Sequence, residues 1–449
     1  LFLFLFSSVF LQAQISGVIT DEKGEALPFA SVYIQNSTQG TTSNVEGYYN
    51  LNLEKGIHTL IYQYVGYEQL TKVVEIGNET LKMNISLKEQ SVALGEVVVT
   101  TGGEDPAYAI IREAQKKRKF YLKQTKEYKC QTYIKGHQSV SDVPEKFMGI
   151  DIGDLGGVLD STGQGIIYLS ESISDFYYQA PDKYKEVMIS SKVSGNDNGF
   201  SFNRASALDF NFYKNTYNWI GKPIVSPIAF NAMNFYTYRL EGAYVDESGN
   251  TVNKIKVKRK RDTDPSVAGH IYIIEDTWNI HSVDMWTDGK AFAIPALDTI
   301  RVQQVYVPVK DDIWQVFSRN ISFNFKIFGI GIDGFFTGMY RNYDIEPNLP
   351  EGFFDTEILK VEEGANEKDS LYWEKIRPIP LTLEETDDYI KKDSLEVMWE
   401  SEEFLDSLDG RANKFGFMNL FTSYTYRKTY KQWNWRINSP FTAIQYNTV

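Results

Sequence analysis

The chain has 449 residues, enough for two or three domains, and 42% of them are hydrophobic, so it can bury sizeable cores. Its formal net charge of −13 argues against nucleic acid as a partner, because binding to phosphates requires a positive surface. The single cysteine, Cys130, cannot form an internal disulfide, so stability must come from burial.

The first 14 residues form an apolar run that is too short to span a bilayer, which needs about 20 residues. The run is typical of the apolar core of a secretory signal peptide, with Ala13 as the small residue before the cut. The alternative is an apolar first strand. We predict that residues 1–14 are a truncated signal peptide and that the protein works in the cell envelope, at the periplasm and outer membrane.

Residues 15–100 show the pattern of a compact all-β unit. Apolar runs are separated by turns rich in Gly, Asp and Asn, which favour tight turns. Tyr49, Leu51 and Leu53 alternate with other residues, so this strand should bury one face. The spacing of the runs predicts a seven-stranded, two-sheet sandwich. The expected strands are residues 15–20, 30–35, 48–53, 58–65, 71–76, 81–87 and 96–100.

The same segment carries a family resemblance. The matching positions are Gly17-Val18-Ile19, Asp21, Gly24, Leu27-Pro28, Ala30-Ser31-Val32, 40–43, Gly47-Tyr48-Tyr49, Gly56, Thr59-Leu60 and Val65-Gly66-Tyr67. This pattern resembles the carboxypeptidase-regulatory-like domain, a transthyretin-like sandwich of Gram-negative envelope proteins. The resemblance implies no peptidase active site. The module also opens many TonB-dependent outer-membrane transporters, and residues 94–100 resemble the lead into their plug.

Residues 105–345 begin with a helix and continue as strands. Asp105-Pro106 is typical of a helix start, and apolar residues from Ala107 to Ala114 follow a helical stripe, which a transporter plug would not show. From residue 128 the pattern returns to period two, and short helices are expected near 203–213 and 226–235. We predict an α+β domain with one large curved antiparallel sheet and helices on one side, similar to periplasmic lipoprotein carriers.

Residues 369–382 carry a second resemblance. Together with the helix at Asp105-Pro106 and the strand Leu169-Ser170-Glu171-Ser172, they resemble an uncharacterised envelope family. In that family a carboxypeptidase-regulatory-like domain precedes a domain of unknown function, and longer members continue into an outer-membrane β-barrel. The resemblance implies no known activity and no catalytic residues.

The remainder of the chain divides by charge. Residues 346–409 are predicted to form an acidic helical linker, with a capping box at Thr382 and Glu385 and one apolar stripe from Leu395 to Leu408. Residues 410–449 contain no Asp or Glu and combine aromatic residues with cations, as membrane interfaces favour. We predict that they are the first strands of a barrel. A soluble pair of aromatic strands is the alternative.

No pattern in the sequence predicts catalysis, a cofactor or a metal site. The four histidines lack the spacing of a zinc peptidase, and an oxygen-rich turn at 195–199 lacks the glutamate of a calcium loop. His270 and His281 flank an expected hairpin, but two half-exposed histidines explain them more simply than a metal. Cys130 is expected to be a buried small hydrophobe.

One basic face is a candidate site. Four lysines alternate along one expected strand, which would place four ammonium groups on one face; they are Lys254, Lys256, Lys258 and Lys260. Such a face is usually exposed to water and discourages another strand from pairing with the edge of the sheet. Binding of anionic lipid or polysaccharide is the functional alternative.

The sequence as a whole predicts a mainly β, non-enzymatic envelope protein that associates with the outer membrane or its proteins. Its role would be binding, assembly or transport, without a cofactor and with an unknown ligand. One alternative is the periplasmic front of a TonB-dependent transporter. The other is a soluble periplasmic lipid or lipoprotein carrier, which would need an apolar pocket under the curved sheet.

Overall fold

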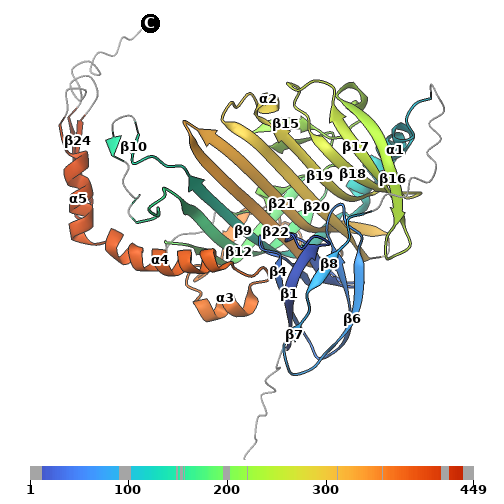
Figure 1. The fold of residues 1–449 in the computed structure, drawn as a ribbon, viewed down its shortest axis with the longest axis horizontal. Helices are drawn as coiled ribbons and strands as arrows, with labels where there is room; N and C mark the ends of the chain where they lie inside the picture. The colour runs from blue at the N-terminus through green and yellow to red at the C-terminus, as the bar shows by residue number, and fades with distance from the viewer. Residues whose placement is uncertain are drawn as a thin grey trace, which may run out of the picture.

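The protein is mainly β in its computed structural model (Figure 1), as the sequence predicts. The structure describes residues 13–90, 103–147, 150–151, 155, 157–195, 203–219, 221–310, 312–355, 357–415 and 424–437. The predicted signal peptide lies outside these residues, except that Ala13 and Gln14 already belong to the first strand. Among the described helices, none has both the length and the apolar composition needed to cross a membrane.

The N-terminal unit is a sandwich of two four-stranded sheets. One sheet contains β1 (Ala13–Asp21), β4 (Tyr48–Leu53), β7 (Leu81–Lys82) and β8 (Ile85–Leu87). The other contains β2 (Ser31–Ile34), β3 (Gly40–Thr42), β5 (Gly56–Gln63) and β6 (Leu70–Ile76). The alternation of Tyr49, Leu51 and Leu53 is confirmed, because all three are buried between the sheets.

The sandwich differs from the prediction in its strand count. The sequence pattern missed β3, and the expected strand 81–87 is divided into β7 and β8. The division occurs where Met83 crosses Gly17 so closely that a Cβ on Gly17 would overlap the Met83 carbonyl group. The expected strand 96–100 lies outside the described residues.

Leu60 provides a test of the sandwich core. It is fully buried opposite Ile34, so Leu60→Ala should lower the free energy of unfolding by about 2–5 kcal/mol through lost burial and a cavity. The matched control on the same strand is Ile57→Ala, because the Ile57 side chain is 74% exposed. Urea denaturation of both variants measures the difference. Equal stabilities would contradict the observed strand phase.

The second unit is built on one eleven-stranded sheet. Its strand order is β16-β17-β18-β19-β20-β21-β22-β9-β12-β13-β23, and every pair is antiparallel except β13 with β23. The strands are β9 (Glu127–Ser141), β12 (Gly165–Gln179), β13 (Lys183–Val193), β16 (Tyr236–Val245), β17 (Thr251–Arg259), β18 (Ala268–Ile274), β19 (Ile280–Asp288), β20 (Leu297–Lys310), β21 (Ile313–Ile327), β22 (Ile330–Asp344) and β23 (Leu359–Val361).

One face of this sheet is covered by α1 (Ala107–Gln124) and by short elements between β13 and β16. These elements are η1 (Ala205–Leu208), the pair β14 (Thr216–Trp219) and β15 (Lys222–Val225), and η2 (Ala232–Asn234). The two predicted short helices are therefore single 3₁₀ turns. Small elements elsewhere are the pair β10 (Lys146–Phe147) and β11 (Ile150–Asp151), and α2 (Gly289–Phe292).

The helix α1 begins as the sequence predicts. Pro106 has helical dihedral angles, and the Asp105 carboxylate accepts a hydrogen bond from the Ala107 amide. On β9, Cys130 and Ile134 face the α1 side, while Tyr133 and Lys135 face the opposite side. The predicted period-two pattern of this strand therefore separates two different packing layers.

The opposite face of the sheet carries the sandwich and the acidic segment (Figure 1). Tyr33 and Ile61 from the sandwich pack against Val305, Phe317 and Met339 of the sheet. The Ser31 and Ser318 hydroxyl oxygens lie 2.9 Å apart across this interface. The sandwich is therefore attached to the sheet through one of its own sheets, and an isolated sandwich would expose those apolar side chains to water.

The acidic segment is helical as predicted, but it is docked on the sheet. It contains α3 (Ser370–Ile376), α4 (Leu383–Trp399) and α5 (Glu402–Ala412), preceded by β23, which makes the sheet mixed where a purely antiparallel one was expected. Both halves of the Thr382–Glu385 capping box form. The predicted apolar stripe is wrong, since the helix breaks before α5 and α4 buries Glu385, Asp388, Tyr389 and Lys392.

Candidate functional site

The predicted lysine face is only partly assembled. Lys254 and Lys256 each form an ion pair with Glu241 on the neighbouring strand, at 3.8 and 3.4 Å. Lys260 lies beyond the end of β17, and its Nζ donates to the Met233 carbonyl oxygen at 2.7 Å. Because β17 is paired on both sides, these lysines do not protect a sheet edge. Glu241 therefore offsets one of the four positive charges of this face, and Lys258 and Lys260 are exposed.

The contacts and burial of His270, His281 and Cys130 indicate structural roles. His270 lies 3.1 Å from a Glu241 oxygen, whereas His281 is buried and burial lowers its pKa to about 4. Cys130 is fully buried as predicted, and burial raises the pKa of its thiol. No group of three or more His, Cys, Asp or Glu side chains in the described parts of the chain is placed to hold a metal ion.

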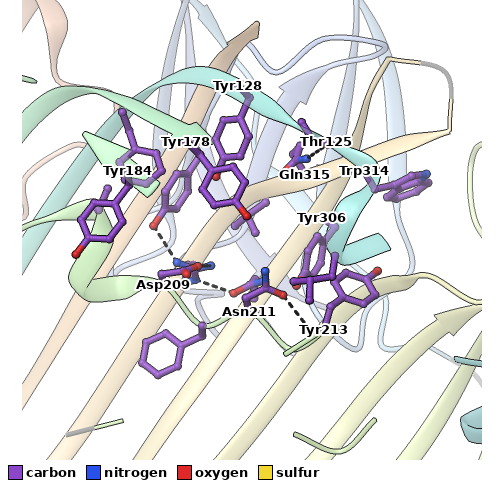
Figure 2. Close-up of a pocket in the computed structure, with 18 of the residues that line it drawn as sticks. Thr125, Tyr128, Tyr178, Tyr184, Asp209, Asn211, Tyr213, Tyr306, Trp314 and Gln315 are labelled. Carbon is purple, nitrogen blue, oxygen red and sulfur yellow. Dashed lines mark hydrogen bonds and ion pairs between the residues drawn. The ribbon is translucent and has the colours of Figure 1, made fainter. Parts of the chain in front are cut away.

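A cavity of about 240 Å³ lies on the α1 side of the sheet (Figure 2). It is rich in aromatic rings but also contains two carboxylates, a lysine, an arginine and three side-chain amides. The lining residues are Tyr121, Leu122, Thr125, Tyr128, Phe176, Tyr178, Asp182, Tyr184, Ala205, Ser206, Asp209, Phe210, Asn211, Tyr213, Lys214, Gln304, Tyr306, Trp314, Gln315, Val316, Arg319, Tyr340 and Tyr343. This mixture makes the cavity the candidate binding site among the described residues.

Arg319 is the buried cation of the cavity, with 4% of its surface exposed. Its Nε donates to Gln304 Oε1 at 2.6 Å, and its Nη1 donates to the Leu208 carbonyl and to the Tyr340 hydroxyl. The nearest carboxylate is Asp209, whose Oδ1 lies 3.9 Å from Nη2. The charge is therefore solvated mostly by neutral oxygens.

No sequence pattern predicted this site, because its residues come from eight separate helices and strands and from the loops between them. On β20, Gln304 and Tyr306 follow the period-two pattern that marks one face. On β21 the phase changes, since the pairing with β20 passes over Phe317 in a β-bulge, and Arg319 could not be assigned to a face from its spacing. The concentration of tyrosines was the only available signal.

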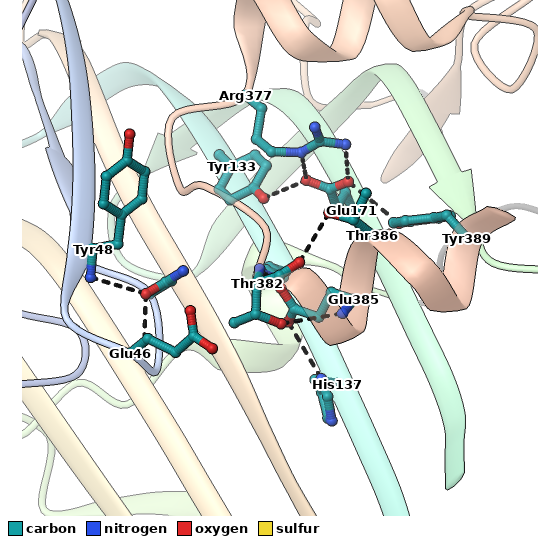
Figure 3. A network of polar contacts seen from close by, with 12 residues as sticks. Glu46, Tyr48, Tyr133, His137, Glu171, Arg377, Thr382, Glu385, Thr386 and Tyr389 are labelled. Carbon is teal, nitrogen blue, oxygen red and sulfur yellow. Dashed lines mark hydrogen bonds and ion pairs between the residues drawn. The ribbon is translucent and has the colours of Figure 1, made fainter. Parts of the chain in front are cut away.

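A second polar cluster joins α3 and α4 to the sheet (Figure 3). Glu171 on β12 accepts two hydrogen bonds from Arg377, at 2.6 and 2.7 Å, and one from each of the Tyr133 and Tyr389 hydroxyls. Beside it, Glu385 pairs with Lys135, and both side chains are almost fully buried. These groups are fully engaged with one another, so the cluster serves attachment of α3 and α4.

The basic C-terminal region forms a hairpin of β24 (Tyr424–Lys428) and β25 (Trp433–Ile437). Directly paired residues share a face, so one side carries Tyr424, Tyr426, Lys428, Trp433, Trp435 and Ile437. The other side carries Thr425, Arg427, Asn434 and Arg436. The hairpin thus has one mainly aromatic face, with Lys428 at its end beside the turn, and one polar, cationic face. Of the predicted barrel region 410–449, residues 410–412 are helical as the end of α5, and residues 416–423 and 438–449 lie outside the described residues.

Two domain families match the chain in the order predicted from the sequence. The CarboxypepD_reg-like domain matches residues 15–99. The family of unknown function DUF5686 matches residues 110–343, more than half of the chain. The chain belongs to the DUF5686 family. The family description assigns no activity to this domain, which contains the cavity's sheet strands.

Curated relatives match only about a fifth of this DUF5686 chain. TonB-dependent receptors P39 and P26 of Formosa agariphila are 32% and 37% identical over 100 and 97 residues. TonB-dependent receptor SusC of Bacteroides thetaiotaomicron is 28% identical over 93 residues. Each match spans 22% or 21% of this chain and 9% of the relative's own length.

Solved structures show a weaker likeness. A DUF1329 family protein from Desulfovibrio piger matches 56% of this chain and 97% of its own, with 9% identity and a TM-score of 0.23. An outer membrane lipoprotein-sorting protein domain from Vibrio parahaemolyticus matches 54% of this chain and 95% of its own, with 8% identity and a TM-score of 0.24. These scores are too low to establish a shared fold.

Proposed function

We propose that this protein is a non-catalytic component of the cell envelope that associates with the outer membrane through its C-terminal hairpin. Its role is binding, assembly or transport. The similarity of part of the chain to TonB-dependent receptors supports an envelope location. The description of the domain family names no reaction. Potentially reactive side chains such as Cys130 and His281 are buried.

The observation that carries this proposal is the division of the β24–β25 hairpin into two unlike faces. Trp433 and Trp435 are 52% and 42% exposed, which is costly in water and favourable at a membrane interface. Alternation of apolar and polar residues is the pattern of strands that face lipid on one side and a polar interior on the other. The neighbouring cations suit anionic lipid headgroups.

The periplasmic front of a TonB-dependent transporter remains the second candidate, because the shared module favours it. The soluble lipid carrier is less well supported. Its ligand would need an apolar pocket, whereas the cavity under this sheet contains Arg319, Asp209 and Gln304. A hydrocarbon chain would offer no hydrogen bond to Asp209 or to Gln304 Nε2, and covering Asp209 with it would remove water from that carboxylate.

Membrane extraction tests the proposal. The full-length protein in a Gram-negative envelope should resist salt and carbonate but dissolve in detergent, whereas a form ending at Asp409 should be soluble. On the aromatic face, Tyr426→Lys with Trp435→Lys should release the protein, since a lysine facing lipid costs about 2–4 kcal/mol at the bilayer midplane.

The matched control is the pair Thr425→Lys and Asn434→Lys on the opposite face of the same hairpin. These changes add the same charge and should leave membrane association intact. Release of the unaltered protein by salt alone would show that the hairpin is not embedded, and the soluble carrier would then be favoured.

A further inference from the structure

The cavity on the α1 side contains a pair of opposite charges that do not touch. Arg319 Nη2 and Asp209 Oδ1 are 3.9 Å apart, beyond hydrogen-bond distance. An oxygen atom placed beside this pair can bridge it, accepting from the guanidinium and donating to the carboxylate. Asp209 is half-exposed at the cavity, so a ligand can reach this gap from outside.

A buried amide beside the gap adds a second polar atom in need of a partner. Gln304 is fully buried, and its Oε1 accepts from Arg319 Nε. The Tyr306 hydroxyl lies near this amide, but Gln304 Nε2 makes no hydrogen bond of normal geometry with a described residue. A buried donor without a partner costs free energy, and a ligand acceptor in the cavity would recover that cost.

The charges of the lining residues indicate an uncharged ligand. Arg319 and Lys214 balance Asp182 and Asp209, and Lys214 itself lies 3.5 Å from Asp209. A carboxylate or phosphate placed against Arg319 would also lie beside Asp209 and be repelled. A hydroxyl group both donates and accepts, so it can satisfy Arg319, Asp209 and Gln304 together.

The rest of the cavity wall is aromatic. Tyr128 stacks on Tyr178 with ring centroids 5.2 Å apart, and Tyr213 meets Tyr306 edge to face at 6.3 Å. Figure 2 shows Tyr128 and Tyr178 on one side of Asp209 and Tyr213 and Tyr306 beyond Asn211. Ring faces present flat apolar surfaces, which suit a ligand with C–H groups on one side and hydroxyl groups on its edge.

From these contacts we propose that the cavity binds a small, uncharged, hydroxyl-bearing ring, of which a single sugar unit is the simplest example. Its hydroxyls bridge Arg319, Asp209 and Gln304, and its apolar face packs on the tyrosine rings. The volume of about 240 Å³ is close to the lower end of ligand pockets and accommodates one such ring. The proposal concerns a site distinct from the hairpin and does not depend on membrane association.

Saturation-transfer NMR on the full-length protein tests this assignment. The probes are glucose, galactose, mannose, xylose and myo-inositol, with benzoate and octanoate as the charged and acyl comparisons. At least one hydroxylated ring should bind more tightly than either comparison. Asp209→Ala should weaken that binding at least about tenfold, because the loss of a hydrogen bond to a charged group lowers affinity by about this factor or more.

Asp262→Ala is the matched control. Like Asp209, Asp262 is an exposed carboxylate near a buried guanidinium, since it lies 3.8 Å from Nη2 of Arg259, which is 7% exposed. Asp262 does not line the cavity. This variant should leave binding unchanged. A second variant, Gln304→Glu, keeps the acceptor for Arg319 and removes the unpaired donor, so it should also weaken binding. Preference for octanoate or benzoate, no binding by any hydroxylated ring, or equal binding to Asp209→Ala would overturn the proposal.

Discussion

Replacing Glu171 with leucine is expected to lower the free energy of unfolding by about 3–5 kcal/mol, the cost of breaking a buried ion pair from one side. Glu171 is fully buried on β12, and it accepts two hydrogen bonds from Arg377 and further ones from Tyr133 and Tyr389. Without the carboxylate, the guanidinium would be left near the sheet with no opposite charge. Urea denaturation measures this loss.

The matched control for Glu171→Leu is Asp175→Leu on the same strand. Asp175 pairs with Lys129 at 2.8 Å, but the two side chains are 23% and 37% exposed. A solvent-exposed pair contributes only about 0–1 kcal/mol, so this variant should be nearly as stable as the unaltered protein. Similar losses of stability in the two variants would mean that the buried Glu171 pair contributes no more than the Asp175 pair.

The double variant Glu171→Leu with Arg377→Leu separates charge from packing. Removing both partners leaves no buried charge, so it should recover much of the stability lost in Glu171→Leu. Hydrogen exchange should locate the loss in α3 and α4, because these helices meet the sheet through this cluster.

Acid is expected to release α4 from the sheet between about pH 4.5 and about pH 2. Burial raises the pKa of the Glu385 carboxyl, but Lys135 and His137 outweigh it and lower that pKa from 4.5 to about 2. A carboxyl with a lowered pKa stabilises the folded state fully above its unfolded pKa and loses this effect as the pH falls through the folded value. The shift corresponds to about 3 kcal/mol.

Hydrogen exchange of the full chain as a function of pH measures this release. Amides of α4 should lose protection in the stated range, while those of α1 on the opposite face of the sheet should remain protected. Glu385→Gln serves as the control, since it cannot ionise and should reduce the pH dependence of α4 to the part contributed by Glu171, whose pKa Arg377 lowers. Simultaneous loss of protection in α1 and α4 would show global acid unfolding in place of local release.

The acidic segment illustrates where the sequence pattern misleads. The sequence predicted an acidic helical linker with an apolar stripe, yet Glu385, Asp388 and Lys392 are buried and Leu383, Ile390 and Val397 are exposed. Hydrophobic periodicity identifies the packed face of a helix only when that face is apolar. Here the sheet surface beneath α4 carries Lys135 and Glu171, so charged residues of the helix find partners there.

The sequence by itself determined the local structure of this protein. Turn residues and period-two patterns predicted the sandwich, the strand at 128–135 and its buried Cys130, and the capping box predicted the start of α4. These features depend on neighbouring residues, whose chemistry acts over one or two turns or a single strand. The family resemblances, confirmed by the two domain matches, added the order of the domains.

Only the tertiary structure decided which distant residues meet. The parallel strand β23, the pairing of Glu171 with Arg377 and the gap between Arg319 and Asp209 each join segments far apart in the chain. Such contacts depend on strand register and on bulges such as the one at Phe317, which change the face that a residue occupies without changing the local pattern. The candidate cavity could therefore be found only once the sheet was assembled.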